Sequence, residues 1–230
     1  MNLVTFSFFL FSLQSKYSDN LNIELAASVF ELLPDKGLFF PEEKALLISD
    51  LHLGKSRHFR RNGLAVPAGE TEATLNSLEK LILRKEAEKV FFLGDLFHSS
   101  INADWELLSD FVHRFDQVEF TLIKGNHDLF PNDFYEKTGI GVCDEFMLRE
   151  DIVLKHEGSN QNQKWVICGH LHPAVRLKGK GRQSIKLSCF LLQEPLLILP
   201  AFGEFTGTRI VSKEKGNRVF VCVEGEVIEV

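Results

Sequence analysis

Continuous apolar runs alternate with amphipathic segments through the first 140 residues of the chain. The runs 44–50 (KALLISD), 89–95 (KVFFLGD) and 118–126 (VEFTLIKGN) each end in polar residues, which is typical of strands buried on both faces. Between them, residues 68–88 and 103–115 place apolar side chains at helical spacing. Two earlier runs, 22–34 and 37–40, predict short strands because Pro34, Gly37 and Pro41 mark turns around them.

After a short helix expected over residues 131–139, the chain becomes strand-rich from about residue 141. The predicted strands lie within 151–157, 164–170, 184–192, 195–203 and 218–230. An α+β fold satisfies this order, with two mixed β-sheets packed face to face and helices outside. No repeat or break in composition divides the chain, so residues 21–230 are expected to form a single domain.

Residues 1–20 are interpreted as an apolar N-terminal extension of uncertain role. The apolar stretch is too short to span a membrane, no Lys or Arg precedes it, and the segment after it is a poor cleavage site. We therefore expect no stable membrane association and a cytoplasmic protein. The sequence leaves open whether this segment is retained or acts as a leader.

Charge and cysteine usage exclude some classes of protein. The net charge of −6 over 230 residues argues against a protein that coats nucleic acid by bulk electrostatics. Two local basic stretches remain, interpreted either as solvated loops or as a DNA-binding surface: Lys55, Arg57, Arg60 and Arg61, then Arg176, Lys178, Lys180 and Arg182. The four cysteines form no CxxC pair, which favours a reducing compartment over a disulfide framework or zinc knuckle.

Polar residues gather at five predicted strand ends. The stretches are ISDLHLG, LGDLFHS, KGNHDLF, LKHEG and CGHLHP, and they present Asp50, His52, Asp95, His98, Asn126, His127, Asp128, His156, His170 and His172. The two remaining histidines are expected to be structural, His113 within an amphipathic helix and His58 in a basic loop. Taken alone, GNHD is as consistent with a capped turn as with a metal site. Taken alone, His156 is consistent with a structural histidine. Their joint occurrence favours a metal centre.

Carboxylate, imidazole and amide donors together suit borderline divalent metals such as manganese, iron or zinc. In D-x-H and H-x-H, an extended chain would point both ligands to one side, so that both could reach one shared site. Gly94, Gly125 and Gly169 directly precede ligands and would let the backbone approach a bound anion. The donors are too many for one ion, so two ions that share a carboxylate are expected.

The ordered motifs D-x-H, G-D-x-x-H, G-N-H-D, an isolated His and G-H-x-H resemble the calcineurin-like metallophosphoesterase superfamily. Together with LPAFG and the chain length, they are most similar to its bacterial ligase-associated DNA-damage-response endonucleases. The resemblance implies a four-layer αββα fold and a DNA substrate. It also implies a ligase and a helicase as repair partners.

The resemblance further implies roles for individual residues. One metal would be held by Asp50, His52 and His172, the other by Asn126, His156 and His170, with Asp95 bridging the two. His127 would protonate the departing oxygen, and Asp128 would orient its ring. The family often has an acid where this chain has His98, which would support a ligand or face the phosphate.

Three functions fit the motifs. The first is a manganese-dependent phosphodiesterase or endonuclease that acts on DNA in repair. The second is a phosphatase or phosphodiesterase that acts on small molecules, such as cyclic nucleotides or pyrophosphates. The third, a non-catalytic scaffold, is disfavoured because every expected ligand and His127 are present.

Overall fold

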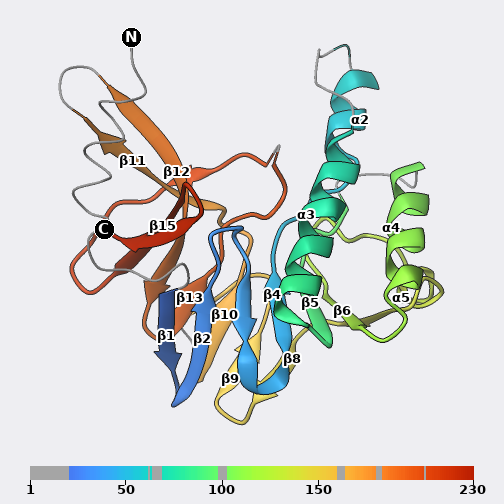
Figure 1. Cartoon of the computed structure of the whole chain (residues 1–230), viewed down its shortest axis with the longest axis horizontal. Coiled ribbons are helices and arrows are strands. Elements are labelled where there is room, and N and C mark those ends of the chain that lie inside the picture. Colours follow the sequence, from blue (N-terminus) through green and yellow to red (C-terminus); the bar gives the residue numbers. More distant parts are fainter. Residues whose placement is uncertain are drawn as a thin grey trace.

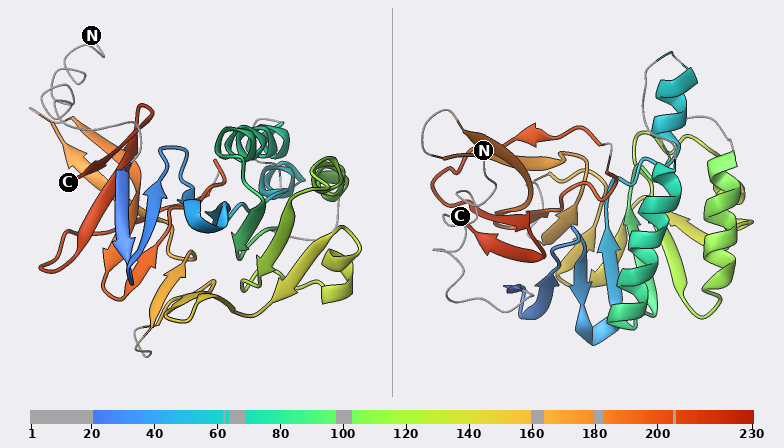
Figure 2. Two further views of the ribbon diagram at one scale, coloured as in Figure 1. Left: turned by 60° about the horizontal axis from the view of Figure 1, so that its bottom comes forward. Right: turned by 45° about the horizontal axis from the view of Figure 1, so that its top comes forward.

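Two β-sheets packed face to face form the centre of the molecule (Figure 1 and Figure 2). The computed structural model describes residues 21–61, 63, 69–97, 103–159, 164–179, 183–204 and 206–230. The N-terminal extension and His98 lie outside these residues. Both sheets are mixed, which confirms the predicted α+β class.

The first sheet has seven strands whose order in space follows the sequence. They are β1 (Leu21–Leu25), β2 (Ser28–Leu32), β3 (Leu38–Phe40), β4 (Ala45–Ile48), β5 (Lys89–Leu93), β6 (Glu119–Ile123) and β7 (Ile140–Cys143). Strands β1 to β4 pair antiparallel, and β4 to β7 pair parallel. Parallel pairing requires crossovers, which are provided by the helices α2 (Lys55–Arg61), α3 (Glu70–Lys85), α4 (Ala103–Arg114) and α5 (Asn132–Glu136). A 3-10 turn, η2 (Pro41–Glu43), precedes β4.

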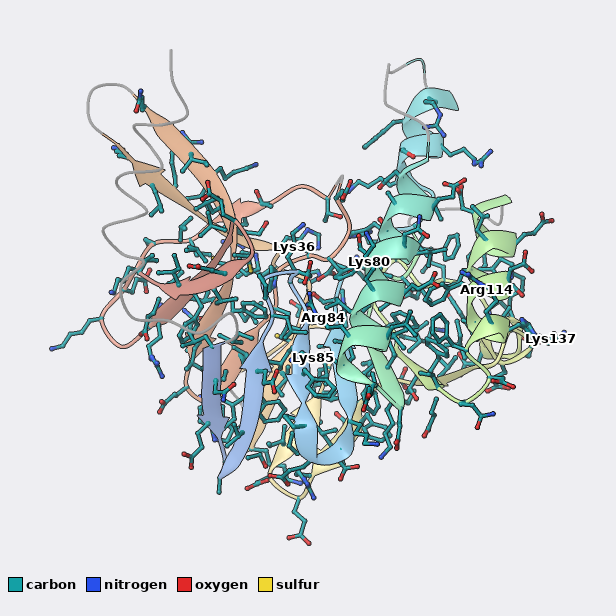
Figure 3. All side chains as sticks on the ribbon, in the orientation of Figure 1. Lys36, Lys80, Arg84, Lys85, Arg114 and Lys137 are labelled. Atoms are coloured by element: carbon teal, nitrogen blue, oxygen red, sulfur yellow. The ribbon has the colours of Figure 1, made fainter. Side chains whose placement is uncertain are left out.

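Successive side chains along the strands of this sheet point to opposite faces, and this produces two hydrophobic cores. Leu46 and Phe92 pack under the helices, whereas Leu47 and Phe91 pack against the second sheet. The predicted helix over 68–88 buries its apolar stripe on the first of these cores, at Leu75, Leu78, Leu81 and Ile82. Ion pairs tie the end of α3 to the β2–β3 region, where Arg84 meets Asp35 at 2.6 Å and Lys85 meets Glu31 (Figure 3).

The second sheet contains all the remaining strands. They are β8 (Phe146–Arg149), β9 (Ile152–Leu154), β10 (Trp165–Cys168), β11 (Pro173–Lys178), β12 (Ser184–Gln193), β13 (Leu196–Ile198), β14 (Arg209–Ile210), β15 (Arg218–Val223) and β16 (Glu226–Glu229). Its centre, β9–β10–β13, is parallel, so the carboxyl ends of these strands lie together. The hairpin β11–β12 extends beyond the rest of the sandwich (Figure 1).

Two sequence-based expectations need correction. In the described part of the chain no helix covers the outer face of the second sheet, whose buried side chains come mostly from strands, so the fourth layer of an αββα arrangement is not formed there. The sequence after β8 carries alternating apolar positions instead of a helical stripe. The basic stretch after His52 is helix α2 and no loop, since Lys and Arg lose little side-chain freedom in a helix.

None of the helices in the described ranges combines the length and the apolar character needed to cross a bilayer.

Candidate metal centre

The predicted ligands lie where parallel strands of the two sheets end. Asp50, Asp95 and Asn126 follow β4, β5 and β6 of the first sheet. His156 and His170 follow β9 and β10 of the second sheet. Strand ends of parallel sheets are where ligands bind in open α/β sheets, and here the ends of two sheets face one another.

The first of two compact sets contains Asp50, His52 and His172, whose potential ligand atoms all lie within 4.8 Å of one another. Asp50 Oδ1 lies 3.1 Å from His172 Nε2. The other ring nitrogen of His172, Nδ1, donates to the Gly207 carbonyl at 2.9 Å. This contact leaves Nε2 with a lone pair that faces the set, as in histidines that bind metals.

The second set contains Asp95, His156 and His170, again within 4.8 Å. His156 Nδ1 lies 2.9 Å from the Leu93 carbonyl oxygen, to which it donates. His156 Nε2 then faces His170 Nδ1 and Asn126 Oδ1, each at 3.0 Å. Asn126 therefore approaches this set as the sequence predicts.

The carboxylate of Asp95 lies between the two sets. Its Oδ2 is 3.7 Å from His52 Nε2, and its Oδ1 is 3.5 Å from His156 Nε2. One carboxylate oxygen is thus directed at each set, which is the geometry required of a bridging ligand.

Most of these residues have left-handed backbone conformations. Positive φ angles occur at Asp50 (54°), His52 (48°), Asp95 (52°), His170 (68°) and His172 (52°). Such conformations cost free energy outside glycine and cluster at functional sites. They also correct the expectation of extended D-x-H and H-x-H segments. Asp50 and His52 share a set, whereas His170 and His172 join different sets.

Two glycines that precede ligands leave room for ligands of the facing sheet. A Cβ on Gly94, whose φ is 80°, would lie 2.1 Å from His156 Nδ1. A Cβ on Gly169 would lie 2.5 Å from Asp50 Oδ2. Both separations are far below van der Waals contact. The glycines were expected to admit an anion, and the structure shows that they admit neighbouring ligands.

The polar atoms of the first set fit a cation. Asp50 Oδ1 and His172 Nε2 are buried, face one another at 3.1 Å and form no hydrogen bond with any other described residue. Burying such groups without a partner is costly, and a metal ion would satisfy both. Burial raises the pKa of the Asp50 carboxyl, but His172, His156 and Ser49 together outweigh this effect and hold the pKa below its usual value. Burial lowers the pKa of the His172 ring, and Asp50 and the Gly207 carbonyl together more than reverse that, so the pKa is raised.

His127 lies beside the centre and is exposed to solvent. Its ring centroid is 5.5 Å from that of His52. Its backbone N–H donates to Asp95 Oδ1 at 3.0 Å, which fixes the main chain of His127 to the bridging carboxylate. The ring is therefore accessible to a substrate bound at the two sets.

Asp128 is buried and accepts hydrogen bonds from backbone N–H groups. The donors are Asp95 (2.7 Å), Leu96 (3.0 Å), Phe97 (3.5 Å) and Gly125 (2.9 Å). Burial raises the pKa of its carboxyl to about 6, against these hydrogen bonds, which lower it. The structure thus gives Asp128 a role in holding two loops, and its orientation of the His127 ring stays a prediction.

His113 and the LPAFG segment lie outside the two ligand sets. His113 lies in α4, where Nδ1 contacts the Ser109 carbonyl at 2.6 Å, as expected of a structural histidine. The LPAFG segment joins the sheets beside Asp50, since Ser49 Oγ donates to the Pro200 carbonyl at 3.1 Å and Phe202 N donates to the Ser49 carbonyl at 2.8 Å. Sequence reasoning missed the carbonyls that orient the histidine rings, because main-chain groups leave no residue-type signal.

The family model for calcineurin-like phosphoesterases matches residues 44–174, which contain both ligand sets. The chain belongs to this family. Two adjacent ligand sets in a calcineurin-like phosphoesterase make a dinuclear centre for divalent metals, and the chain is a metal-dependent phosphoesterase.

The solved structures include one similar across nearly the whole chain. The nuclease MPE from Pseudomonas putida is 33% identical, with a TM-score of 0.79 over 92% of this chain and 100% of that one. The phosphoesterase Yfce from E. coli is 15% identical, with a TM-score of 0.37 over 81% of this chain and 97% of that one. No curated protein sequence matches the chain.

Proposed function

We propose that this phosphoesterase is a DNA endonuclease that hydrolyses phosphodiester bonds at a dinuclear manganese centre. The observation that carries the proposal is the similarity to the Pseudomonas putida nuclease, which extends over the full length of that protein at 33% identity. The paired ligand sets support it, because two metals that share a carboxylate suit in-line displacement at phosphorus.

The contacts within each set support one distribution of the ligands. Asp50, His52 and His172 would hold one ion, Asn126, His156 and His170 would hold the other, and Asp95 would be shared by both. The proposed ligands offer oxygen and nitrogen donors, which suit manganese, iron or zinc, and of these we propose manganese. When bound, the two ions neutralise phosphoryl charge and lower the pKa of water at the site.

His127 acts as the general acid. Its exposed ring stands beside the first set and can reach a phosphate ester there, and the hydrogen bond from its backbone to Asp95 keeps it in place. The proton leaves a ring nitrogen of His127 and passes to the departing oxygen of the ester. Asp128 orients this ring in addition to its backbone contacts.

The resemblance to ligase-associated endonucleases supports a cellular role. We place the protein in DNA repair, in the cytoplasm, together with a DNA ligase and a helicase. All four cysteines are free, which supports a reducing compartment.

A cleavage assay with closed circular DNA tests this function. Circular DNA has no ends, so only an endonuclease converts it to nicked and linear forms. The protein is first stripped with a chelator and then reloaded with manganese, iron or zinc. Nicking that is highest with manganese supports the proposal. Hydrolysis of cyclic nucleotides, pyrophosphates or monoesters with no cleavage of circular or single-stranded DNA would overturn it in favour of a small-molecule phosphoesterase.

A further inference from the structure

The β11–β12 hairpin has one basic face and one apolar face. In its antiparallel register, Arg176 lies opposite Lys186, and Lys178 lies opposite Ser184. Side chains alternate along a strand, so Arg176, Lys178 and Lys186 share one face, which we call the basic face. The opposite face carries Val175, Leu177, Ile185 and Leu187.

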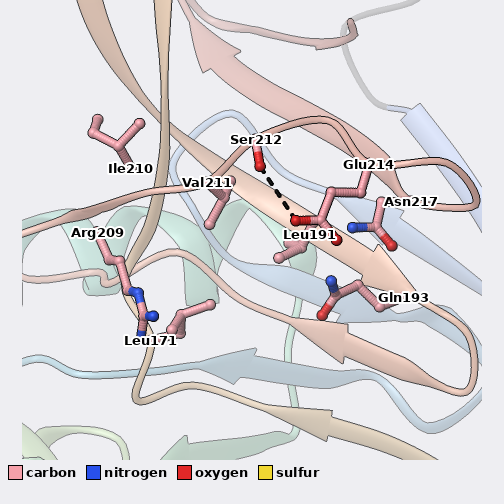
Figure 4. A pocket seen from close by; sticks show the side chains of 9 residues that line it. All are labelled: Leu171, Leu191, Gln193, Arg209, Ile210, Val211, Ser212, Glu214 and Asn217. Carbon is pink, nitrogen blue, oxygen red and sulfur yellow. Dashed lines mark hydrogen bonds between the residues drawn. The ribbon is translucent and has the colours of Figure 1, made fainter.

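The basic face lies on the side of the sheet where the metal centre is. Further along β12, the even-numbered Phe190 and Leu192 pack into the core between the two sheets, so the basic face continues that inner face beyond the first sheet. The odd-numbered Leu191 and Gln193 instead line a pocket of about 280 Å³ beside Leu171, on the opposite face (Figure 4).

The basic face also begins at the metal centre along the chain, because β11 starts directly after the ligand His172. A strand rises about 3.3 Å per residue, which places Arg176 about 13 Å and Lys178 about 20 Å from His172 along β11. Figure 1 shows the hairpin reaching outward from the ends of the central strands.

The charge on this face is not compensated. Arg176, Lys178 and Lys186 are exposed, and within the described residues none of them forms an ion pair or hydrogen bond through its side chain. The other side chains on the face, Ala174, Ser184 and Ser188, are neutral. Like charges directly opposite on paired strands destabilise a sheet, so Arg176 and Lys186 cost folding free energy that no ion pair in the described part of the chain offsets.

We propose that the basic face binds the phosphate backbone of DNA on one side of the phosphate being cleaved. This proposal rests on the proposed nuclease function. Successive phosphates of one strand of a duplex lie about 3.4 Å apart along its axis. The basic face would therefore contact phosphates about four to six positions from the metal centre. These contacts would fix the orientation of the DNA relative to the metal centre.

The test compares the salt dependence of DNA cleavage in two double variants. Arg176→Gln/Lys186→Gln removes two charges from the basic face. Lys80→Gln/Lys137→Gln is the matched control, which removes one charge from α3 and one from the end of α5 (Figure 3). For each protein, kcat/KM on a labelled duplex is measured across a range of NaCl concentrations, and hydrolysis of bis(p-nitrophenyl) phosphate is measured in parallel.

Each cation that meets a phosphate adds about 0.9 to the slope of log affinity against log salt. We expect the basic-face variant to have a slope shallower by about 1.8, with a larger loss on DNA than on the small diester, and the control to keep the wild-type slope. An unchanged slope in the basic-face variant would overturn the proposal for this face alone. An equal loss on both substrates would also overturn it, since that result indicates a damaged metal centre. A wild-type protein that hydrolyses the diester but no DNA would overturn the proposed function as well.

Discussion

Asp95 and Asp128 hold each other's loops in place. The Asp128 carboxylate accepts the backbone N–H of Asp95 at 2.7 Å, and the Asp95 carboxylate accepts the backbone N–H of His127, the neighbour of Asp128, at 3.0 Å. The loop that carries Asp95 and the loop that carries His127 are therefore fixed to one another. Their positions do not depend on a bound metal alone.

Asp128→Ala should lower the free energy of unfolding of the metal-free protein. The substitution leaves the buried N–H groups of Asp95 and Leu96 and the part-buried N–H group of Gly125 without their acceptor, and each buried group costs about 1–3 kcal/mol unless water enters. We expect a total loss of at least about 2 kcal/mol in urea denaturation. Asp133→Ala, at an exposed site on α5, is the control and should stay within about 0.5 kcal/mol. Unchanged stability in Asp128→Ala would mean that Asp128 does not hold the two loops, and its role would be limited to orienting the His127 ring.

Asp95→Ala should lose metal and activity together. One oxygen of this carboxylate faces each ligand set, so its removal weakens both sites at once. Elemental analysis of the loaded protein should find fewer than two ions per chain, with hydrolysis of the small diester lost. Asp116→Ala, on the exposed turn after α4, should retain both ions. Two fully occupied sites in Asp95→Ala would show that the carboxylate is no bridge.

Gly94→Ala should displace His156 and disable one ligand set. The added Cβ would lie 2.1 Å from His156 Nδ1, at a backbone φ of 80° that is itself strained for alanine. Gly225→Ala separates the two effects, because its φ is 83° and no atom lies within 4 Å of the added Cβ. We expect about one metal ion per chain in Gly94→Ala and two in Gly225→Ala, by titration with manganese after chelation. Equal metal content in both variants would mean that the clash is relieved elsewhere.

The sequence predicts the strands and the ligands for a shared physical reason. Buried parallel strands appear as apolar runs, and their polar ends must converge once the strands pair, so the sequence alone predicts that Asp50, Asp95 and His156 lie together. The roles of the individual ligands are predicted from the family resemblance, which depends on the order of the five motifs. Helix α2 was missed because its basic residues, such as Arg57, resemble a solvated loop; Arg57 instead pairs with Asp104 at 2.7 Å.

Other features could not be derived from residue types. His170 and His172 have left-handed conformations and belong to different sets, and no local pattern indicates φ > 0 at histidine. The reason that Gly94 is glycine lies in His156, which is 62 residues away in sequence. Tertiary contacts of this kind become visible only when the two sheets are placed against one another.

The buried thiols should be inert in the folded protein. Burial raises the pKa of Cys168 and of Cys189 to about 12, so almost no thiolate is present at neutral pH, and the thiolate is the reactive form. With a chromogenic disulfide reagent at pH 7, both should react only after denaturation, as followed by mass mapping of labelled peptides. The partly exposed Cys143 serves as the internal reference and should react first. Rapid labelling of Cys168 in the native protein would indicate that the second sheet opens readily.

His127→Ala should slow hydrolysis while leaving the metal centre loaded. Its ring lies beside His52 but belongs to neither ligand set, so its loss removes a proton donor and no ligand. We expect a decrease in kcat of roughly 10²–10⁴-fold for esters with poor leaving groups. The decrease should shrink for nitrophenyl esters, because a leaving group of low pKa departs without protonation.

His113→Ala is the matched control for His127→Ala. His113 lies on α4 and contacts the Ser109 carbonyl, so its removal should leave both kcat and the leaving-group dependence unchanged. A series of phosphodiesters with graded leaving-group pKa values gives the slope of log kcat for each protein. A general acid predicts a steeper slope in His127→Ala than in the wild type, since the variant must expel the unprotonated oxygen. Parallel slopes, with a uniform loss of rate, would instead mean that His127 only positions the substrate.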